Sequence, residues 1–230
     1  MELRHCKNDR LTYGEKRTTV SNVRMNEVKD TRSRILDVAE ELFSEQGFDR
    51  VSIRDITKIA EVNLAAINYH FGSKEDLIAA VFERHIVPLN QARMSALEVL
   101  QKSSKKHLKL EDILEAFIRP TIECSFGTPK GGKAFSQLLG RCLSETNPEI
   151  EAMLRRQCVP LIDKMDAALM QALPKLSRAD IFWRMKFTYG ALHHWLLTKD
   201  KFQPDWMVAV DVEAQIQKLI SFAAAGFRAV

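Results

Sequence analysis

Residues 52–73 carry the signals that most restrict how this chain can fold. Ser52 and Asp55 form the S-x-x-D pattern of a capping box, which predicts the start of a short helix. Asn63 is a natural N-cap for a second short helix, and Gly72 is suited to end it in the left-handed conformation. Only residues 61–63 separate the two helices. This spacing predicts a helix-turn-helix.

The second of these helices, residues 64–71, has an outer surface that fits neither a core nor water. Ile67 and the aromatic residue one turn later can pack inward, because residues four apart share a helix face. Leu64, Ala65 and Asn68 then point outward. Small apolar groups can contact a thymine methyl group, and an Asn amide can pair with adenine through two hydrogen bonds. The pattern indicates a helix that lies in the major groove of double-stranded DNA.

Side chains beside this helix are suited to the DNA backbone. Tyr69, His70 and Lys74 carry hydrogen-bond donors of the kind that contact phosphates. The helix start at Ser73 also directs free backbone N–H groups outward, which favours an anion. Two plainer alternatives stay open: the segment is a helical hairpin without a DNA role, or His70 only packs and caps.

The remainder of the chain reads as helices, so the predicted fold class is all-α with about nine helices. Gly and Pro number sixteen together and fall mostly at breaks. An apolar stripe over residues 35–43 gives a first helix that Gly47 ends, and a long helix should follow from Ser73 to about residue 101, kinked or split at Pro88. Further helices are predicted at 110–126, 132–143, 147–172, 177–199 and 206–228, with a flexible loop at 126–133.

Charge and hydropathy exclude some classes of protein. The net charge is +4, but residues 25–85 carry twelve Asp/Glu against eight Lys/Arg, so DNA contacts must come from individually placed residues. No apolar run approaches the ~18 residues of a membrane span, and the N-terminus carries charges where a signal peptide needs an apolar segment. We therefore expect a cytoplasmic protein with no membrane partner. Residues 1–28 lack apolar periodicity and are predicted to be a mostly disordered arm.

Residues 31–82, TRSRILDVAEELFSEQGFDRVSIRDITKIAEVNLAAINYHFGSKEDLIAAVF, resemble the DNA-binding domain of the TetR family of transcriptional regulators, including the Y-H-F-x-S-K-E signature. The resemblance implies a homodimer with a helix-turn-helix domain at 29–75 and a ligand-binding and dimerisation domain at 76–230. It implies base contacts from Leu64, Ala65, Ala66 and Asn68. It implies phosphate contacts from Thr31, Ser52, Arg54, Tyr69, His70 and Lys74.

The turn departs from the family pattern at one position. The family usually has Gly where this chain has Glu61. A residue other than Gly at positive φ costs on the order of 1 kcal/mol. We therefore expect a slightly reshaped turn and a small change in the direction of the second helix.

Two C-terminal segments, LLGRCLSETNPEI (138–150) and IFWRMKFTYGALHHWL (181–196), resemble PsrA-type regulators. That resemblance implies a small apolar effector such as a long-chain fatty acid or its thioester; a regulator of the same fold that responds to an aromatic or cationic xenobiotic is the alternative. Residues that can line an apolar cavity or pair with an acidic head group are Phe117, Phe135, Arg141, Met165, Trp183 and Phe187. Their plainer role is ordinary core and surface.

The last two helices are expected to form the dimer interface, because small residues in FAAAGF (222–227) permit close helix approach. The predicted contact residues are Leu192, Trp195, Leu196, Phe222 and Ala224. The adjacent pair His193-His194 is a poor metal chelate, because neighbouring helical side chains point about 100° apart. We expect no cofactor and no metal. We find no catalytic motif and no heptad repeat, so neither an enzyme nor a coiled-coil scaffold is predicted.

Overall fold

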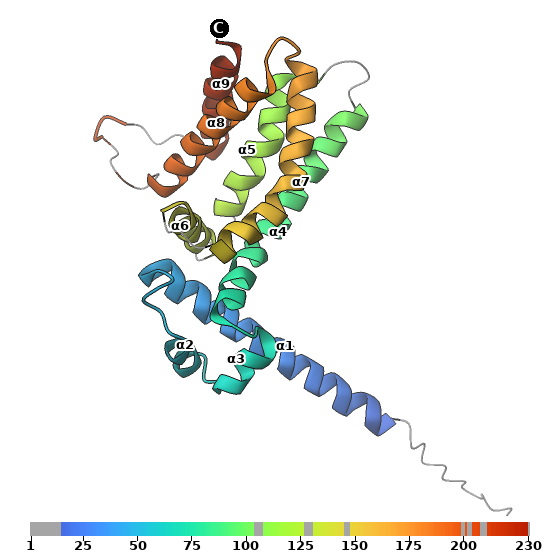
Figure 1. Cartoon of the computed structure of the whole chain (residues 1–230), viewed down its shortest axis with the longest axis vertical. Helices are drawn as coiled ribbons and strands as arrows, with labels where there is room; N and C mark the ends of the chain where they lie inside the picture. Colours follow the sequence, from blue (N-terminus) through green and yellow to red (C-terminus); the bar gives the residue numbers. More distant parts are fainter. Residues whose placement is uncertain are drawn as a thin grey trace, which may run out of the picture.

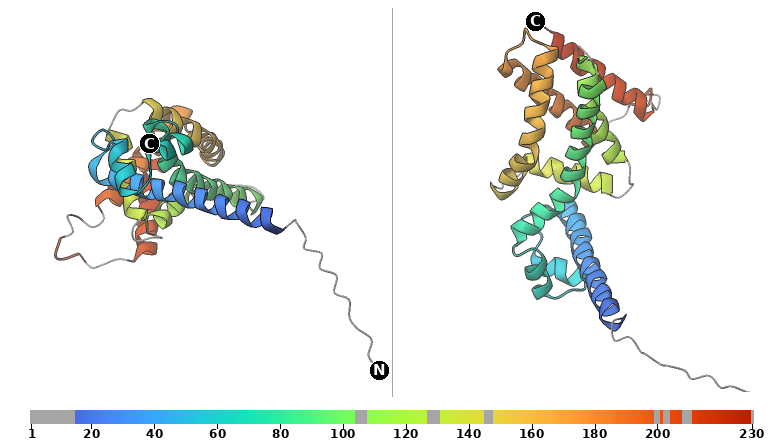
Figure 2. Two further views of the ribbon diagram at one scale, coloured as in Figure 1. Left: turned by 90° about the horizontal axis from the view of Figure 1, so that it is seen from below. Right: turned by 90° about the vertical axis from the view of Figure 1, so that its right-hand side faces the viewer.

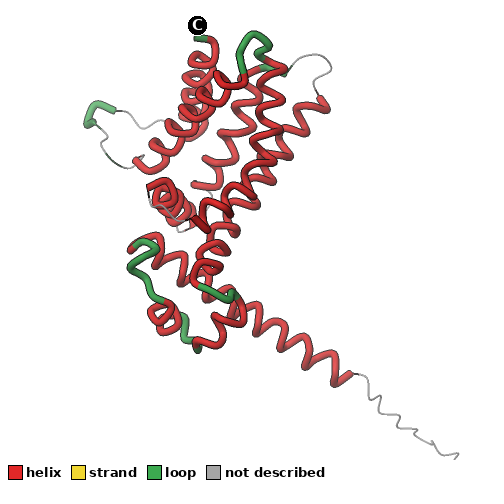
Figure 3. Tube along the Cα trace, viewed as in Figure 1, coloured by secondary structure: helices red, strands yellow, loops and turns green. Residues whose placement is uncertain are grey.

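The computed structural model describes residues 15–103, 108–126, 131–144, 148–198, 201, 204–207 and 211–229. Within these ranges the secondary structure is nine α-helices and no strand, which confirms the predicted fold class (Figure 3). The helices are α1 (Glu15–Gln46), α2 (Ile53–Ile59), α3 (Leu64–His70), α4 (Lys74–Ser103), α5 (Leu110–Phe126), α6 (Gly131–Ser144), α7 (Pro148–Ala172), α8 (Arg178–Thr198) and α9 (Val212–Arg228).

The first helix begins earlier than the sequence pattern indicated. The disordered arm predicted for residues 1–28 is wrong for 15–28, since α1 starts at Glu15, and residues 1–14 lie outside the described part of the chain. Residues 15–46 contain no Gly or Pro, so nothing local stops the helix from extending past its apolar stripe. Figure 1 shows this end of α1 projecting away from α2 and α3.

Helices α1, α2 and α3 and the start of α4 enclose one apolar cluster. Phe48 lies at its centre, with ring centroids 5.7 Å from Phe43 and 5.8 Å from Phe82. Gly47, at φ 91°, ends α1 as predicted and turns the chain so that Phe48 folds back. Leu138 of α6 and Ile150 and Met153 of α7 complete the same cluster. The N-terminal helices therefore share their core with two later helices.

Helix α4 links this cluster to the larger C-terminal bundle (Figure 2). It continues through Pro88 as one helix, so the proline does not split it. Leu77 and Val81 near its start belong to the N-terminal cluster, whereas Leu97 near its end belongs to the C-terminal core. A displacement at one end of α4 must therefore be accommodated in both cores.

The C-terminal core is built from α4, α5, α7, α8 and α9. Its fully buried aliphatic residues include Ile113, Leu114, Ile118 and Leu169. Helix α9 begins at Val212 rather than at the predicted residue 206, because Asp211 is its N-cap and accepts a 2.7 Å hydrogen bond from the Ala214 amide. Part of the predicted loop, residues 127–130, lies outside the described residues, and α6 already begins at Gly131. None of the described helices is both long and apolar enough to cross a membrane.

Candidate nucleic-acid interface and effector site

Side-chain caps fix where α2 and α3 begin. The Asp55 amide donates to Ser52 Oγ at 3.2 Å, and the Ser52 amide donates to Asp55 Oδ2 at 2.9 Å. These bonds form the predicted capping box, and the hydrogen bonds from Ser52 hold the pKa of Asp55 below its ordinary value. Asn63 caps α3 through a 2.8 Å bond that its Oδ1 accepts from the Ala66 amide. The caps thus set the orientation of both helices.

The turn between them is strained at the position that the sequence marked. Glu61 has φ +52°, and it is the one residue other than Gly with positive φ in the described chain. The Val62 amide donates to the Thr57 carbonyl at 3.0 Å, which continues the turn beyond the end of α2. Glu61 therefore adopts the left-handed conformation, although Gly would adopt it at a lower cost in free energy.

Helix α3 presents one buried and one exposed face. Ile67 is buried in the N-terminal cluster, and Phe71, which follows the helix, packs partly against that cluster. Leu64 is 54% exposed, and Ala65 and Asn68 are exposed beside it. The exposed face is the one that the sequence predicted to point away from the core.

Polar groups surround this face. Tyr69 is 78% exposed, while His70 and Lys74 are partly exposed. Arg54 is exposed on α2, and Ser52 keeps its hydroxyl in a 2.6 Å hydrogen bond to Asp55 Oδ2. Ala66 and Thr31 are partly exposed. All ten of the sequence-predicted DNA-binding residues thus lie in or beside α1–α3 and the start of α4.

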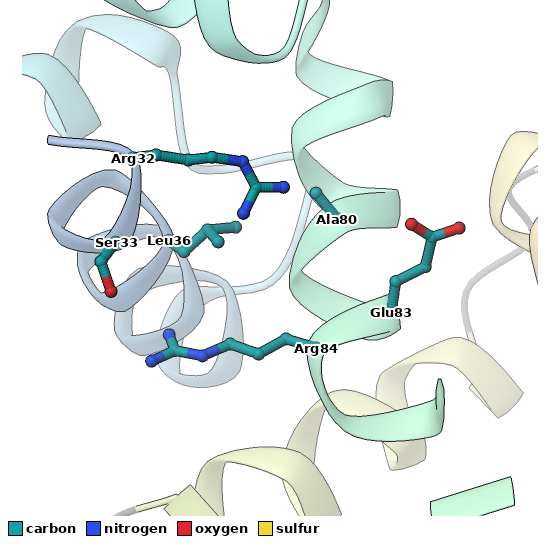
Figure 4. Close-up of a pocket in the computed structure, with 6 residues that line it drawn as sticks. All are labelled: Arg32, Ser33, Leu36, Ala80, Glu83 and Arg84. Carbon is teal, nitrogen blue, oxygen red and sulfur yellow. The ribbon is translucent and has the colours of Figure 1, made fainter. Parts of the chain in front are cut away.

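Charged residues join α1 to α4 just behind the helix-turn-helix. Arg84 pairs with Asp37 and, at 3.4 Å, with Glu40, and His85 Nε2 lies 2.9 Å from Glu40 Oε1. Figure 4 shows the adjoining pocket, where Arg84 points toward α1 and Glu83 points to the opposite side of α4. The pocket has a volume of about 330 Å³ and is lined by Arg32, Ser33, Leu36, Ala80, Glu83 and Arg84. Its charged lining makes it a junction between helices rather than an apolar effector site.

His85 is a half-buried member of this junction. Its ring stacks on Phe135 of α6 with centroids 5.0 Å apart. Burial works against the charged form, but the interactions of His85 with Cys124 and with the Glu40 carboxylate, 2.9 Å from Nε2, outweigh it and raise the pKa of His85 to about 9. The imidazolium form therefore links α4 to α1 at neutral pH.

A second polar centre lies inside the C-terminal bundle, where sequence analysis did not expect one. Arg93 of α4 is 3% exposed, and its guanidinium lies 4.2 Å from the centroid of the Phe117 ring. It donates to the Phe117 carbonyl at 3.2 Å, to Asn90 Oδ1 at 3.2 Å and to Thr121 Oγ1 at 2.6 Å. No carboxylate of the described residues pairs with it. Burial lowers the pKa of Arg93 to about 10, so it stays cationic at pH 7.

Two residues of α8 complete this centre. The Tyr189 ring lies 6.2 Å from the Phe117 ring and 4.1 Å from the His193 ring. His193 is 4% exposed, and its Nε2 has no hydrogen-bond partner among the described residues. Burial, aided by the charge of Arg93, lowers the pKa of His193 to about 4, so the imidazole is neutral at pH 7. The centre therefore has one cation and no compensating anion.

A shallow groove of about 380 Å³ also runs between α4 and α5 on the outer surface. It is lined by Ser95, Ala96, Val99, Leu100, Asp112, Glu115, Ala116, Arg119 and Pro120. Arg119 is held there by hydrogen bonds to Glu115 and Glu213, which raise its pKa above the ordinary value. The charges of Arg119 and Glu115 in this groove are thus already paired within the chain.

The predicted effector residues are placed differently from one another. Phe117 and Met165 are buried in the C-terminal core, and Phe135 packs on His85. Trp183 and Phe187 are 51% and 67% exposed, so they do not line an interior cavity of this chain. These two residues are exposed because α8 carries apolar side chains on several faces, and other residues form the face that packs into the core.

Arg141, predicted as a candidate for an acidic head group, and two other arginines of the C-terminal helices have partners within the chain. Arg141 donates to the carbonyls of Ser44 and Glu45, where it satisfies the C-terminal end of α1. Arg184 caps the end of α9 in the same way, and Arg155 pairs with Glu151 on the surface. Arg141 therefore has a structural role at the end of α1, and its predicted contact with an effector stays a prediction. Sequence analysis did not single out Arg93, which is the buried arginine of the C-terminal bundle.

Three of the five predicted dimer residues are inside the subunit. Leu192, Leu196 and Ala224 are buried in the C-terminal core, so they have no surface to offer a partner, and that part of the prediction is corrected. Trp195 is partly exposed and Phe222 is 68% exposed. The small residues of α9 allow close approach to helices of the same chain, as the burial of Ala224 demonstrates.

Comparisons with known proteins agree with this division of the chain. Residues 35–81 match the model described as bacterial regulatory proteins, tetR family, and residues 115–226 match the one described as tetracyclin repressor-like, C-terminal domain. The chain is 25% identical over 184 residues to the HTH-type transcriptional regulator AcrR of Shigella flexneri, covering 76% of this chain and 83% of that protein.

Solved structures of similar fold come from distant relatives. The fatty acid degradation regulator FadR of Bacillus halodurans has a TM-score of 0.64 at 16% identity, covering 87% of this chain and 97% of that one. NalD of Pseudomonas aeruginosa, the secondary repressor of the MexAB-OprM multidrug efflux pump, has a TM-score of 0.60 at 20% identity with the same coverage. At these identities the likeness shows the fold alone. The finer resemblance to PsrA-type regulators is not confirmed.

Proposed function

The chain belongs to the TetR family of bacterial regulatory proteins, and from this we propose that it is a ligand-responsive repressor that binds a palindromic operator as a homodimer. The observation that carries the proposal is the exposed face of α3. Leu64, Ala65 and Asn68 lie in solvent while Ile67 anchors the helix. Such a helix can enter the major groove with its first residues against the base edges.

In this proposal the bases and the backbone are read by different residues. Leu64, Ala65 and Ala66 contact thymine methyl groups, and Asn68 pairs with adenine. The remaining predicted residues position the protein through phosphates; they are Thr31, Ser52, Arg54, Tyr69, His70 and Lys74. If the Ser52 hydroxyl contacted a phosphate, it would have to give up its hydrogen bond to Asp55. We therefore expect Ser52 to contribute less to phosphate binding than Lys74.

The dimer is proposed to form through exposed aromatic residues of the last two helices. Phe182, Trp183 and Phe187 lie together on α8, where the Trp183 and Phe187 rings stack with centroids 5.9 Å apart. Phe222 is exposed on α9. An aromatic group of this size left in solvent favours a protein interface. Two half-sites can then be read together by one dimer.

We propose an apolar effector that binds the C-terminal bundle, with a long acyl chain favoured over an aromatic or cationic xenobiotic. Support comes from the resemblance of residues 138–150 and 181–196 to fatty-acid-responsive regulators, and from flexible Met94, Met165 and Met185 in or against the core. FadR is a regulator of fatty acid degradation and NalD is a repressor of a multidrug efflux pump, so proteins of similar fold include both kinds of regulator.

A mobility-shift assay with DNA from upstream of the protein's own gene tests the DNA-binding role. We expect a shift that disappears when either half-site is scrambled. If no fragment of that region is shifted at any salt concentration, autoregulation through this helix-turn-helix is excluded.

A thermal-shift series of fatty acids from eight to eighteen carbons tests the effector. At a hundredfold excess over its dissociation constant a ligand stabilises the folded state by about 2.7 kcal/mol, which raises the melting temperature by roughly 5–10 °C. Longer chains should do better, since each buried methylene contributes about 0.8 kcal/mol. A flat series with a strong response to a planar aromatic compound would contradict the acyl hypothesis and leave the DNA-binding role intact.

A further inference from the structure

The buried guanidinium of Arg93 has donors that the protein does not use. A guanidinium carries five N–H groups, and the bonds to Phe117, Asn90 and Thr121 use three of them. That leaves two N–H groups, one on each terminal nitrogen, without an acceptor among the described residues. An N–H group on each terminal nitrogen can donate to the oxygens of a carboxylate.

The surroundings of Arg93 supply no negative charge. The groups that act on its charge are Tyr189, Cys158 and Cys124, and none of them is Asp or Glu. The other buried polar neighbours are Asn90, Thr121 and His193, which are neutral. A buried charge without a counterion is unfavourable unless something else compensates it. Each arginine that forms a salt bridge in the described chain has at least one carboxylate partner, whereas Arg93 has none.

Further polar atoms near Arg93 are also unused. Nε2 of His193 is buried without a hydrogen-bond partner among the described residues, and burial raises the pKa of the nearby Tyr189 hydroxyl to about 12. Buried polar atoms are normally paired, so an unpaired set beside an unpaired cation needs an explanation. Aliphatic core residues and adaptable methionines surround the group.

We propose that Arg93 is the binding site for the anionic head group of the effector, with His193 and Tyr189 as neutral hydrogen-bonding partners. The inference rests on the proposed ligand-responsive function and narrows the class of ligand to an apolar molecule with a carboxylate or similar anion. The apolar part of the ligand then lies among the surrounding aliphatic and Met side chains. It replaces contacts that these side chains make with one another in the free protein. A cationic ligand is disfavoured, because it would meet a buried positive charge.

The test compares ligands that share the same apolar part and differ only in the head group. Binding to the full-length protein is measured by calorimetry at pH 7.5 for dodecanoate, dodecanol and dodecylamine, and for 2-naphthoate with the matching alcohol and amine. We expect the carboxylate of at least one set to bind at least about 10-fold more tightly than its alcohol and its amine. Equal binding within both sets, preference for the amine, or no binding of any of the six compounds overturns the proposal.

Variants separate a head-group site from a structural arginine. Arg93→Met keeps the length of the side chain and should weaken carboxylate binding by about 30-fold while leaving alcohol binding nearly unchanged. Arg93→Lys keeps the charge and should restore part of the preference. Arg155→Met removes an exposed arginine as the matched control and should change nothing. An Arg93→Met protein that folds and still prefers the carboxylate overturns the proposal; if it does not fold, the head-group series on the unmodified protein decides.

The head-group result and the proposed function can fail separately. Operator binding without ligand is measured on the same preparations. Retained operator binding together with no carboxylate preference refutes only the site at Arg93. Loss of operator binding in the unmodified protein refutes the proposed regulator, whatever the head-group series gives.

Discussion

His85→Gln is expected to change how the stability of this protein depends on pH. In the folded protein the pKa of His85 is raised to about 9 by its bonds to Cys124 and Glu40, despite the opposing effect of burial. In the unfolded chain an ordinary value of about 6.5 applies. A raised pKa in the folded state means that this contribution is fully present below about pH 6.5 and is lost as the pH rises through 9.

The magnitude follows from the difference between the two pKa values. One pKa unit corresponds to 1.36 kcal/mol, so His85 contributes at most about 3 kcal/mol at pH 6 and almost nothing at pH 9.5. The side chains of His85 and Glu40 are only 15% and 10% exposed, so screening by solvent reduces this little. Gln keeps a similar size and a hydrogen-bond donor but cannot be protonated.

Urea unfolding between pH 6 and pH 9.5 measures the effect. The free energy of unfolding of the unmodified protein, minus that of His85→Gln, should fall by about 3 kcal/mol across this range. Glu40→Gln should reduce the same slope, because it removes one of the two partners of His85. His194→Gln, at an exposed position of the neighbouring bundle, is the matched control. A difference that does not vary with pH would refute the link between α1 and α4 through a charged His85.

Four further outcomes are expected. Lys74→Ala should weaken binding to all DNA sequences alike and lower the slope of log K against log salt by about 1.8 per dimer; an unchanged slope removes Lys74 from the phosphate contacts. Asn68→Ala should relax preference at one symmetric base position by about 1–3 kcal/mol, as measured by binding-site selection; uniform weakening reassigns it to the backbone. Phe187→Glu should give monomers in sedimentation, whereas Val159→Glu, at an exposed position on α7, should not. Glu61→Gly should raise the stability by roughly 0.5–1 kcal/mol, because relief of the left-handed conformation exceeds the entropy cost of Gly; a lower melting temperature contradicts this.

Features set by neighbouring residues could be predicted from the sequence. The capping box at Ser52, the N-cap at Asn63 and the glycine caps form as expected, because each depends on bonds within one helical turn. The positive φ of Glu61 is expected for a different reason, because the family usually has Gly at this position. The early start of α1 could not be predicted from apolar periodicity, since a helix that extends beyond its packed face has none.

Features that depend on which helix faces meet could not be predicted. Helix α8 is apolar on several sides, so its sequence does not distinguish Leu192, which is buried, from Phe187, which is exposed. A signal for Arg93 was nevertheless present. Leu89, Arg93 and Leu97 are spaced by four residues and therefore share one face of α4. An arginine within an apolar stripe indicates a buried charge. A buried charge needs a partner, so the pattern raises the question of which group pairs with this arginine.

Helix α4 gives a physical route from effector to DNA. Arg93 lies eight residues after His85, or about 12 Å along the helix, and the Asn90 that it bonds also donates to the Gln157 carbonyl of α7 at 2.9 Å. Gln157 in turn donates to Glu83, next to the pairs that join α4 to α1. An anion that draws Arg93 away from Asn90 and Thr121 would change the packing of α4 on α5 and α7. Because α4 is continuous into the N-terminal cluster, such a change can favour one orientation of α3 over another, provided that the anion binds the two states with different affinity.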